Sequence, residues 1–382
     1  MRKKQQPILI EVNAKYINEN TKVWCVHSGK SKKVLDKFIK DSVIALDIPG
    51  VQLNDLTLDD QDELSRNILM SEAIQKYYQE ARKSPEKMPV VPVRDPAKYE
   101  IPTNRKDAFR LTYKRNAILS FHRDISKGDL IITPSRTSYE PFLFGVVKES
   151  PLKFMSYTFP HYLDAPVPAM PVEWIEHKVT KRDLPAQLSK LLERNVPITS
   201  INTKKFGPSL FTAVFGAYFD GVSFGVDFHC PGYRGSNPLE TVPVQELIAV
   251  LTAIFNVVET EGFEGLGDKT FNVLKDQYYE EEYIFSLENE FHSPGYYRAI
   301  SKIGVLGLML LLAIPLSGST KFDADNLDKV LLVNASKKQK QDFERLIKPM
   351  LKHMNPSTKK ELNKKVKEAK ESLKAKTVAK VN

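Results

Sequence analysis

The chain has 382 residues, of which 42% are apolar and 27% charged, with a formal net charge of +9. This length allows two domains, and the apolar content is enough to build a core in each. The two cysteines, Cys25 and Cys230, lie far apart without a second pair, which excludes a disulfide framework and indicates a reducing compartment. The apolar run near the N-terminus is too short for a signal peptide, so we predict a cytoplasmic protein.

The positive charge is concentrated at the C-terminal end. Residues 337–382 hold 15 Lys and Arg against 5 Asp and Glu, so residues 1–336 carry about −1. We therefore predict a basic helical tail over 321–382. A solvated helix is the ordinary interpretation of such a tail, and contact with nucleic acid or an anionic membrane is the alternative.

Short strands and helices alternate in the first half of the chain. Apolar runs predict strands at 8–12, 22–26 and 43–46, and helical spacing predicts helices at 34–39 and 53–82. Regular structure is predicted to resume at 107–119. Five prolines between 83 and 103 exclude a continuous helix or central strand there, so this segment is predicted to be an insert.

Residues 125–147 form the centre of the predicted first domain. Lys127-Gly128-Asp129 is a turn signal that precedes an apolar run, and a second run follows at Phe142–Val147. Two such runs around a polar loop predict a β-hairpin that displays residues 133–139. Gly145, among bulky neighbours, indicates a bulge or a close approach of the backbone.

The second half of the chain is predicted to form a separate domain with apolar helices. After a predicted strand at 172–176 and a leucine-rich helix, we place a domain boundary near 204–205. An apolar helix is predicted over 244–259. Residues 303–316 are uncharged, but this stretch is shorter than the roughly 20 residues that cross a bilayer. A buried or oligomer-forming helix is the favoured interpretation, and an interfacial membrane segment stays open.

Two weak constellations could support catalysis. Asp164 followed by Glu176 and Lys178 matches a PD-(D/E)xK metal-dependent nuclease loosely, although a polar strand face explains the same residues. Asp227 and His229 share a face of an alternating strand and could belong to an active site or to a polar sheet surface. Since neither motif is complete, the enzymatic character stays open and we predict no cofactor and no metal site.

A binding site for a flipped nucleobase fits the polar residues of the first domain better. Such a site needs an aromatic platform, polar groups for the base edge and cations for phosphate. The first strand supplies Trp24, His27 and Ser28, the hairpin loop supplies Thr133, Ser135 and Arg136, and Trp174 lies on the closing strand. Core packing is the alternative for both tryptophans.

The order of these elements resembles the N-terminal module of Mrr-like restriction proteins, a PUA-like or EVE-like barrel. The resemblance covers residues 20–203 and rests on a W-x-V strand, a K-G-D-L strand that ends in a proline loop, a G-x-V strand and a V-x-W strand. It implies recognition of modified or flipped bases in bacterial anti-phage defence. The aromatic stretch that precedes K-G-D-L in that family is represented here by Tyr113 and Phe121.

We therefore predict an α+β chain with a PUA-like β-barrel reader over 1–204, a mixed effector or oligomerisation domain over 205–320 that contains the apolar helix, and the basic tail over 321–382. The expected function is anti-phage defence by sensing nucleic acid, with DNA favoured over RNA. A divergent Mg-dependent nuclease and a membrane effector that acts through 303–316 are the alternatives. A homo-oligomer and a partner protein from the same defence operon are the further partners considered.

Overall fold

The chain divides into two compact units in a computed structural model. Unit 1 comprises Met1–Glu19 and Gly207–Asn382, and unit 2 comprises Asn20–Phe206. The division after Phe206 lies close to the boundary predicted near 204–205. Both units mix helices and strands, which confirms a mixed α and β chain. The structure describes residues 8–29, 32, 34–51, 54–83, 86, 89–137, 139–149, 155–162, 165–194, 196–233, 237–290, 295–317 and 330–381.

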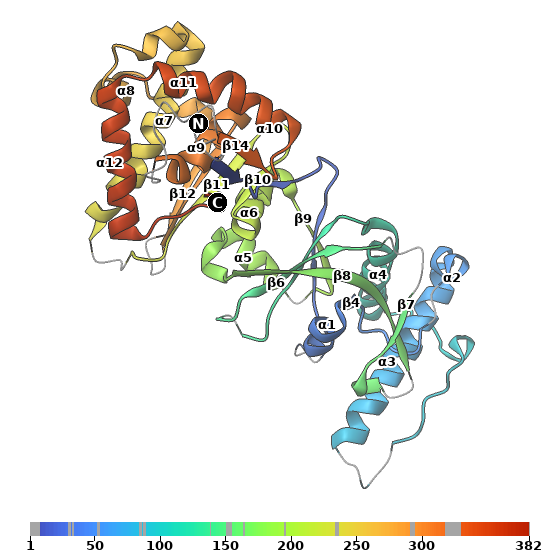
Figure 1. The fold of residues 1–382 in the computed structure, drawn as a ribbon. Coiled ribbons are helices and arrows are strands. Elements are labelled where there is room, and N and C mark those ends of the chain that lie inside the picture. Colours follow the sequence, from blue (N-terminus) through green and yellow to red (C-terminus); the bar gives the residue numbers. More distant parts are fainter. Residues whose placement is uncertain are drawn as a thin grey trace, which may run out of the picture. The chain divides into compact units, whose positions relative to one another are not determined.

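Unit 2 is built on a seven-stranded sheet that curls into a half-barrel (Figure 1). Its strand order is β4-β8-β6-β5-β3-β9, and β7 pairs with β8. The long strand β8 joins the two parts of the sheet, because its first half pairs with β4 and β7 and its second half with β6. The strands are β3 (Val23–Val26), β4 (Val43–Ala45), β5 (Leu130–Thr133), β6 (Phe142–Val147), β7 (Met155–Thr158), β8 (Pro166–Val179) and β9 (Ile198–Ile201).

The predicted central hairpin is confirmed, and its glycine has a packing role. β5 and β6 pair antiparallel with Leu130 opposite Val146. A Cβ atom added at Gly145 would lie 2.8 Å from Cε3 of Trp174 on the neighbouring strand. The indole N–H of Trp174 donates to the carbonyl oxygen of Phe38 at 2.9 Å, which holds the ring in place. The predicted close approach at Gly145 is therefore an approach to an aromatic ring.

Replacing Gly145 with alanine is expected to lower the free energy of unfolding by about 1–3 kcal/mol, because the new methyl group must displace the Trp174 ring. Urea denaturation followed by tryptophan fluorescence measures the change. Gly267→Ala is the control, since a Cβ atom there would meet nothing closer than 3.4 Å. Equal stability of the two variants would contradict the packing role of Gly145.

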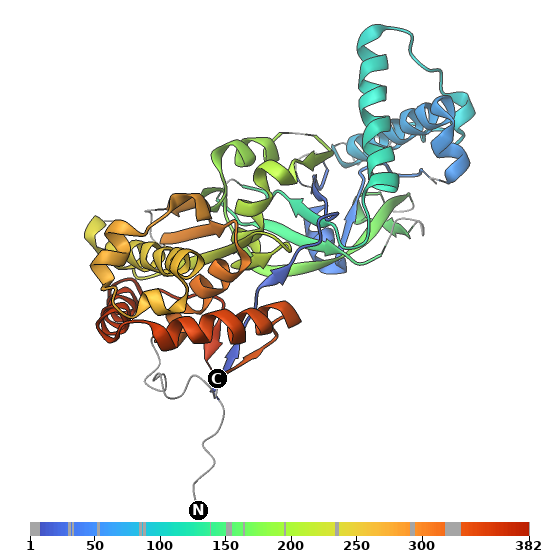
Figure 2. The ribbon, with the colours of Figure 1, turned by 90° about the horizontal axis from the view of Figure 1, so that it is seen from above.

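Helices cover both faces of the unit 2 sheet. Trp24 and Val26 point into an apolar core beneath α3 and α4, whereas the thiol of Cys25, on the opposite face, donates to the carbonyl oxygen of Leu192 on α5. In Figure 2, α4 stands with its N-terminal end away from the sheet. The helices are α1 (Leu35–Asp41), α2 (Asp55–Asp59), α3 (Gln61–Lys83), α4 (Arg105–Leu119), a π-helical turn (Ser120–Asp124), α5 (Ala186–Leu192) and 3₁₀ turns at Pro96–Lys98, Pro160–Tyr162 and Lys181–Asp183.

Unit 1 contains two sheets that share the N-terminal segment. A five-stranded sheet has the order β12-β13-β11-β10-β2, and a three-stranded sheet has the order β14-β1-β15. In the smaller sheet, β1 pairs parallel with β14 and antiparallel with β15, so the two ends of the sequence meet. The strands are β1 (Ile8–Glu11), β2 (Lys15–Tyr16), β10 (Ala217–Phe219), β11 (Phe224–Cys230), β12 (Ile284–Glu290), β13 (Gly295–Ser301), β14 (Val330–Val333) and β15 (Lys380–Val381).

Two apolar helices form the centre of the unit 1 core. The described side chains of α9 from Leu306 to Ala313 are buried, so the predicted apolar helix is a core helix here. Among the described residues, one helix, over 239–261, has the length and apolar character of a membrane span, and most of it is buried in the unit, as in the core helices of soluble proteins. The helices are α6 (Thr203–Phe215), α7 (Val242–Glu261), α8 (Phe271–Gln277), α9 (Gly304–Ser317), α10 (Lys337–Asp342), α11 (Lys348–His353) and α12 (Pro356–Leu373), with a π-helical turn (Phe343–Ile347) and 3₁₀ turns at Pro238–Thr241, Phe263–Leu266 and Glu281–Tyr283.

The predicted basic tail is not confirmed, because the C-terminal residues are part of unit 1. Leu362, Val366 and Leu373 of α12 are buried, and this helix packs on α7. Residues 207–336 carry a net charge of −10 and residues 337–382 carry +10. Lys365 of α12 accordingly forms an ion pair of 2.9 Å with Glu246 of α7. The basic segment thus compensates the acidic part of its own unit.

Candidate functional site

Several of the predicted binding residues lie at the same end of the unit 2 sheet, where two parallel strands end. β3 and β5 run side by side with Cys25 opposite Ile132, so both strands reach the same edge of the sheet. His27 and Ser28 follow β3, and Thr133 is the last residue of β5. We refer to the residues of this edge as the strand-end cluster: His27, Ser28, Lys32, Thr133, Arg136 and Tyr139.

His27 is a neutral, buried histidine in this cluster. Lys32 Nζ lies 2.9 Å from His27 Nδ1, and because an ammonium only donates, Nδ1 accepts and the ring proton is on Nε2. Burial, and then the charge of Lys32, lower the pKa of His27 to about 4, while a hydrogen bond with the backbone of Leu192 acts in the opposite direction. Burial also lowers the pKa of Lys32. Charge is therefore disfavoured on both side chains.

Two hydroxyl groups of the cluster are buried without a protein partner. Ser28 and Thr133 are both 0% exposed. Neither hydroxyl oxygen has a hydrogen-bond partner among the described residues. A buried polar group without a partner costs about 1–3 kcal/mol, so native proteins hold few of them. The hydrogen-bonding capacity of these two hydroxyls is therefore unused among the described residues.

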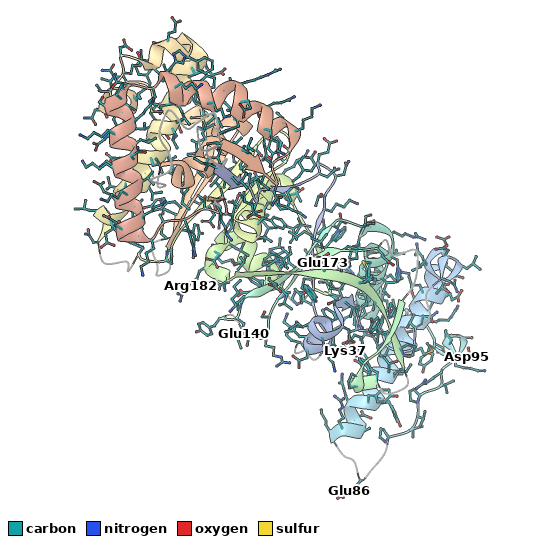
Figure 3. The ribbon with its side chains drawn as sticks, viewed as in Figure 1. Lys37, Glu86, Asp95, Glu140, Glu173 and Arg182 are labelled. Atoms are coloured by element: carbon teal, nitrogen blue, oxygen red, sulfur yellow. The ribbon has the colours of Figure 1, made fainter. Side chains whose placement is uncertain are left out.

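The loop between β5 and β6 is folded back on itself beside α1. The hydroxyl of Ser135 donates to the carbonyl oxygen of Pro141, a contact within the loop. The guanidinium of Arg136 pairs with Asp36 of α1. Figure 3 accordingly shows Glu140 of the loop and Lys37 of α1 on the same side of the sheet. Tyr139 of this loop is 87% exposed, a feature that the sequence reasoning missed.

Both tryptophans make hydrogen bonds within the fold, and Trp24 is nearly fully buried. Trp24 is 5% exposed, and its indole N–H donates to Asp129 at 3.0 Å. The same carboxylate accepts from the backbone N–H groups of Lys22 and Ser126, so it joins the start of β3 to the turn before β5. Stacking of a base on Trp24 is excluded by this burial, which leaves Tyr139 as the accessible aromatic side chain of the cluster. Asp129 was visible in the sequence only as a turn residue.

The two aromatic residues from the family resemblance lie outside the strand-end cluster. Tyr113 is on α4 and is 38% exposed. Phe121 is in the π-helical turn, 1% exposed, and packs edge-on against His122 in the core. Phe121 is thus unavailable for stacking with a ligand, whereas Tyr113 is accessible.

The predicted nuclease residues are not assembled into a site that the structure describes. Asp164 lies outside the described residues. Glu176 and Lys178 are both exposed on β8. Within the described part of the chain, no group of three or more His, Cys, Asp or Glu residues is placed to hold a metal ion. The nuclease prediction therefore stays a prediction.

Asp227 and His229 lie on one face of β11, as the alternation predicts, but Asp227 belongs to a buried ion-pair group. Arg298 on β13 is 1% exposed and lies 2.9 Å from Glu288 of β12 and 3.5 Å from Asp227. Burial disfavours the charge of Arg298, but Asp227, Tyr296 and Glu288 outweigh this effect and raise its pKa. His229 is exposed, and its backbone pairs with Lys376. The ion pairs of Arg298 thus join β11, β12 and β13.

The positive charge of the protein belongs mainly to unit 2. Unit 2 holds 30 Lys and Arg against 23 Asp and Glu, a net charge of +7, and unit 1 carries +2. The strand-end cluster therefore lies in the unit with the surplus of cations, whereas the C-terminal basic segment is compensated within unit 1.

Comparisons of this chain with protein-family models, curated proteins and solved structures find no match.

Proposed function

We propose that this protein senses nucleic acid and that unit 2 binds it through the strand-end cluster. The observation that carries this proposal is the pair of buried hydroxyls, Ser28 and Thr133, that lack a hydrogen-bond partner among the described residues and lie in the unit with a net charge of +7. A nucleobase offers donors and acceptors on its edge that satisfy such groups. The phosphates of the same ligand are attracted by the net positive charge of this unit.

Each exposed member of the cluster has a role under this proposal. Tyr139 supplies a ring on which a base stacks, and stacking on an aromatic side chain is worth about 1–3 kcal/mol per base. Arg136 is half-exposed and its ion pair with Asp36 is at the surface, so a phosphate replaces that carboxylate at small cost. His27, held neutral, presents no charge to an uncharged base edge.

The proposed biological setting is the one that the resemblance to Mrr-like restriction proteins implies. Unit 2 corresponds to the reader of a cytoplasmic anti-phage defence protein, and unit 1 to an effector or assembly region that responds to binding. DNA with a modified or flipped base is the proposed ligand. A nuclease activity has no assembled residues among those described, so it is not proposed.

Replacing Thr133 with valine tests the proposed role of the hydroxyl. Valine keeps the shape and removes a buried group without a partner, so the free energy of unfolding is expected to stay equal or rise. The affinity of the full chain for its preferred base is expected to fall about 5-fold, the equivalent of one hydrogen bond. Fluorescence anisotropy with 20-nucleotide DNA and RNA oligonucleotides, plain and base-modified, measures the affinity, and urea denaturation measures the stability.

Thr252→Val is the matched control, because Thr252 of α7 is also 0% exposed but its hydroxyl donates to the carbonyl oxygen of Ile248 at 2.8 Å. This variant is expected to lose about 1 kcal/mol of stability and to keep its affinity. A Thr133→Val protein that binds every oligonucleotide like the wild type would remove this hydroxyl from the site. A loss of stability equal to that of the control would show that the hydroxyl has an internal partner.

A further inference from the structure

An exposed face of α4 combines aromatic rings with cations. Residues 105, 109 and 113 are four positions apart and 106 and 110 lie beside them, so all five share one side of the helix. Phe109 is 74% exposed and Tyr113 is 38% exposed, while Leu111 and Ile118 turn to the core. The residues of this side are Arg105, Lys106, Phe109, Arg110 and Tyr113, which we call the α4 face.

The internal contacts of unit 2 account for only part of this face. Glu72 of α3 binds Lys114 at 2.5 Å and Arg110 at 3.1 Å, so these two cations have partners within the fold. Arg105 and Lys106 have no ion-pair partner among the described residues. They also lie in the first helical turn, where the helix dipole disfavours a cation by about 0.3–1 kcal/mol. Their position therefore does not serve the stability of α4.

The two aromatic side chains are equally unexplained by packing. A phenylalanine that is 74% exposed contributes little burial energy, and Tyr113 follows it one helical turn later at a side-chain spacing of about 6 Å. Exposed rings beside cations are the combination that binds single-stranded nucleic acid, because bases stack on the rings and phosphates contact the cations. An anionic ligand also removes the unfavourable interaction of Arg105 and Lys106 with the dipole.

We propose that the α4 face binds single-stranded nucleic acid, with bases stacked on Phe109 and Tyr113 and phosphates at Arg105 and Lys106. This inference rests on the proposed function and adds a second contact for the same ligand within unit 2. The face is expected to accept any sequence, because every base has a ring surface that can stack on Phe109 or Tyr113. The strand-end cluster is the surface that selects a particular base.

The test is fluorescence anisotropy of the full chain with 15-nucleotide oligo-dT and oligo-U and with a 15-base-pair duplex, over a series of salt concentrations. The variant Phe109→Ala/Tyr113→Ala is expected to bind both single strands at least 10-fold more weakly with an unchanged salt slope, and to bind the duplex like the wild type. Arg105→Gln/Lys106→Gln is expected to reduce the salt slope by about 1.4, because two phosphate contacts are lost from a single strand.

Phe285→Ala is the control, because Phe285 is 57% exposed on the edge strand of unit 1. It is expected to bind like the wild type. Wild-type binding by both α4 variants would overturn the inference, as would an equal loss in the control. A change of oligomeric state in light scattering with unchanged binding would identify the α4 face as a contact between copies and would also overturn it. If the wild type binds no nucleic acid, the proposed function fails as well.

Discussion

Replacing Arg298 with methionine is expected to lower the free energy of unfolding by about 3–5 kcal/mol, because the change removes one partner from a buried ionic group and leaves two carboxylates uncompensated. Arg298 is 1% exposed, and its guanidinium lies between Glu288 and Asp227 on a single face of the sheet. The guanidinium carbon also lies 4.3 Å from the centroid of the Tyr296 ring, which packs against the guanidinium. Urea denaturation measured by circular dichroism gives the change.

Two comparison variants separate the ionic effect from lost packing. Asp227→Leu/Glu288→Leu/Arg298→Met removes all three charges and is expected to recover most of the loss, since apolar replacements of buried ionic groups are often neutral or stabilising. Lys148→Met breaks a surface pair with Glu173 and is expected to change stability by less than about 0.5 kcal/mol. A single Arg298→Met variant as stable as Lys148→Met would contradict the ionic role of Arg298.

Acidification from pH 7 to pH 4.5 is expected to lower the stability of unit 2 by about 2 kcal/mol for each of two buried histidines. Burial, together with the charge of Lys32 for His27 and of Arg123 for His122, lowers both pKa values to about 4. The unfolded chain, with a histidine pKa near 6.5, therefore binds more protons than the folded chain between these values. The stability that the two neutral histidines contribute is complete above pH 6.5 and is lost as the pH falls towards 4.

The double variant His27→Gln/His122→Gln is expected to flatten the stability curve between pH 6.5 and pH 4.5, because glutamine does not titrate. His353→Gln is the matched control, since His353 of α11 is exposed, and its curve is expected to follow the wild type. Urea denaturation at a series of pH values supplies the curves. If the double variant keeps the slope of the wild type, the two histidines are not the origin of the acid sensitivity.

Local elements could be predicted from the sequence because they depend on neighbouring residues. The turn at Lys127-Gly128-Asp129 and the apolar runs around it define the hairpin of β5 and β6 without help from distant residues. The three-stranded sheet of unit 1 could not be predicted in this way. It joins β1 near the N-terminus to β14 and β15 near the C-terminus, and a single sequence carries no signal for a pairing over that separation.

The candidate site was predicted in part for the same reason. His27, Ser28 and Thr133 were predicted from their place at the ends of strands, and the pairing of β3 with β5 puts these strand ends at one end of the sheet. Tertiary packing decides which side chains are buried. It buries Trp24, which is hydrogen-bonded to Asp129, and leaves Tyr139 exposed. The sequence contains both aromatic residues but does not indicate which of them faces the solvent.

The largest difference between the prediction and the structure concerns which part of the protein carries the surplus of positive charge. Counted along the chain, the surplus belongs to residues 337–382, but these residues fold against an acidic part of unit 1. Counted by unit, the surplus belongs to unit 2. Division of the protein at residue 204 would also leave β1 and β2 of unit 1 on the wrong fragment, so binding experiments require the full chain.

Nucleic-acid binding by unit 2 is measured through the salt dependence of the affinity of the full chain for single-stranded and duplex oligonucleotides. We expect binding that weakens as salt rises, with a log–log slope set by the number of phosphate contacts. We also expect Arg136→Gln to lower the affinity while the melting temperature stays nearly constant, because its ion pair with Asp36 is exposed. Absence of binding to every DNA and RNA probe at about 50 mM salt would contradict the claim.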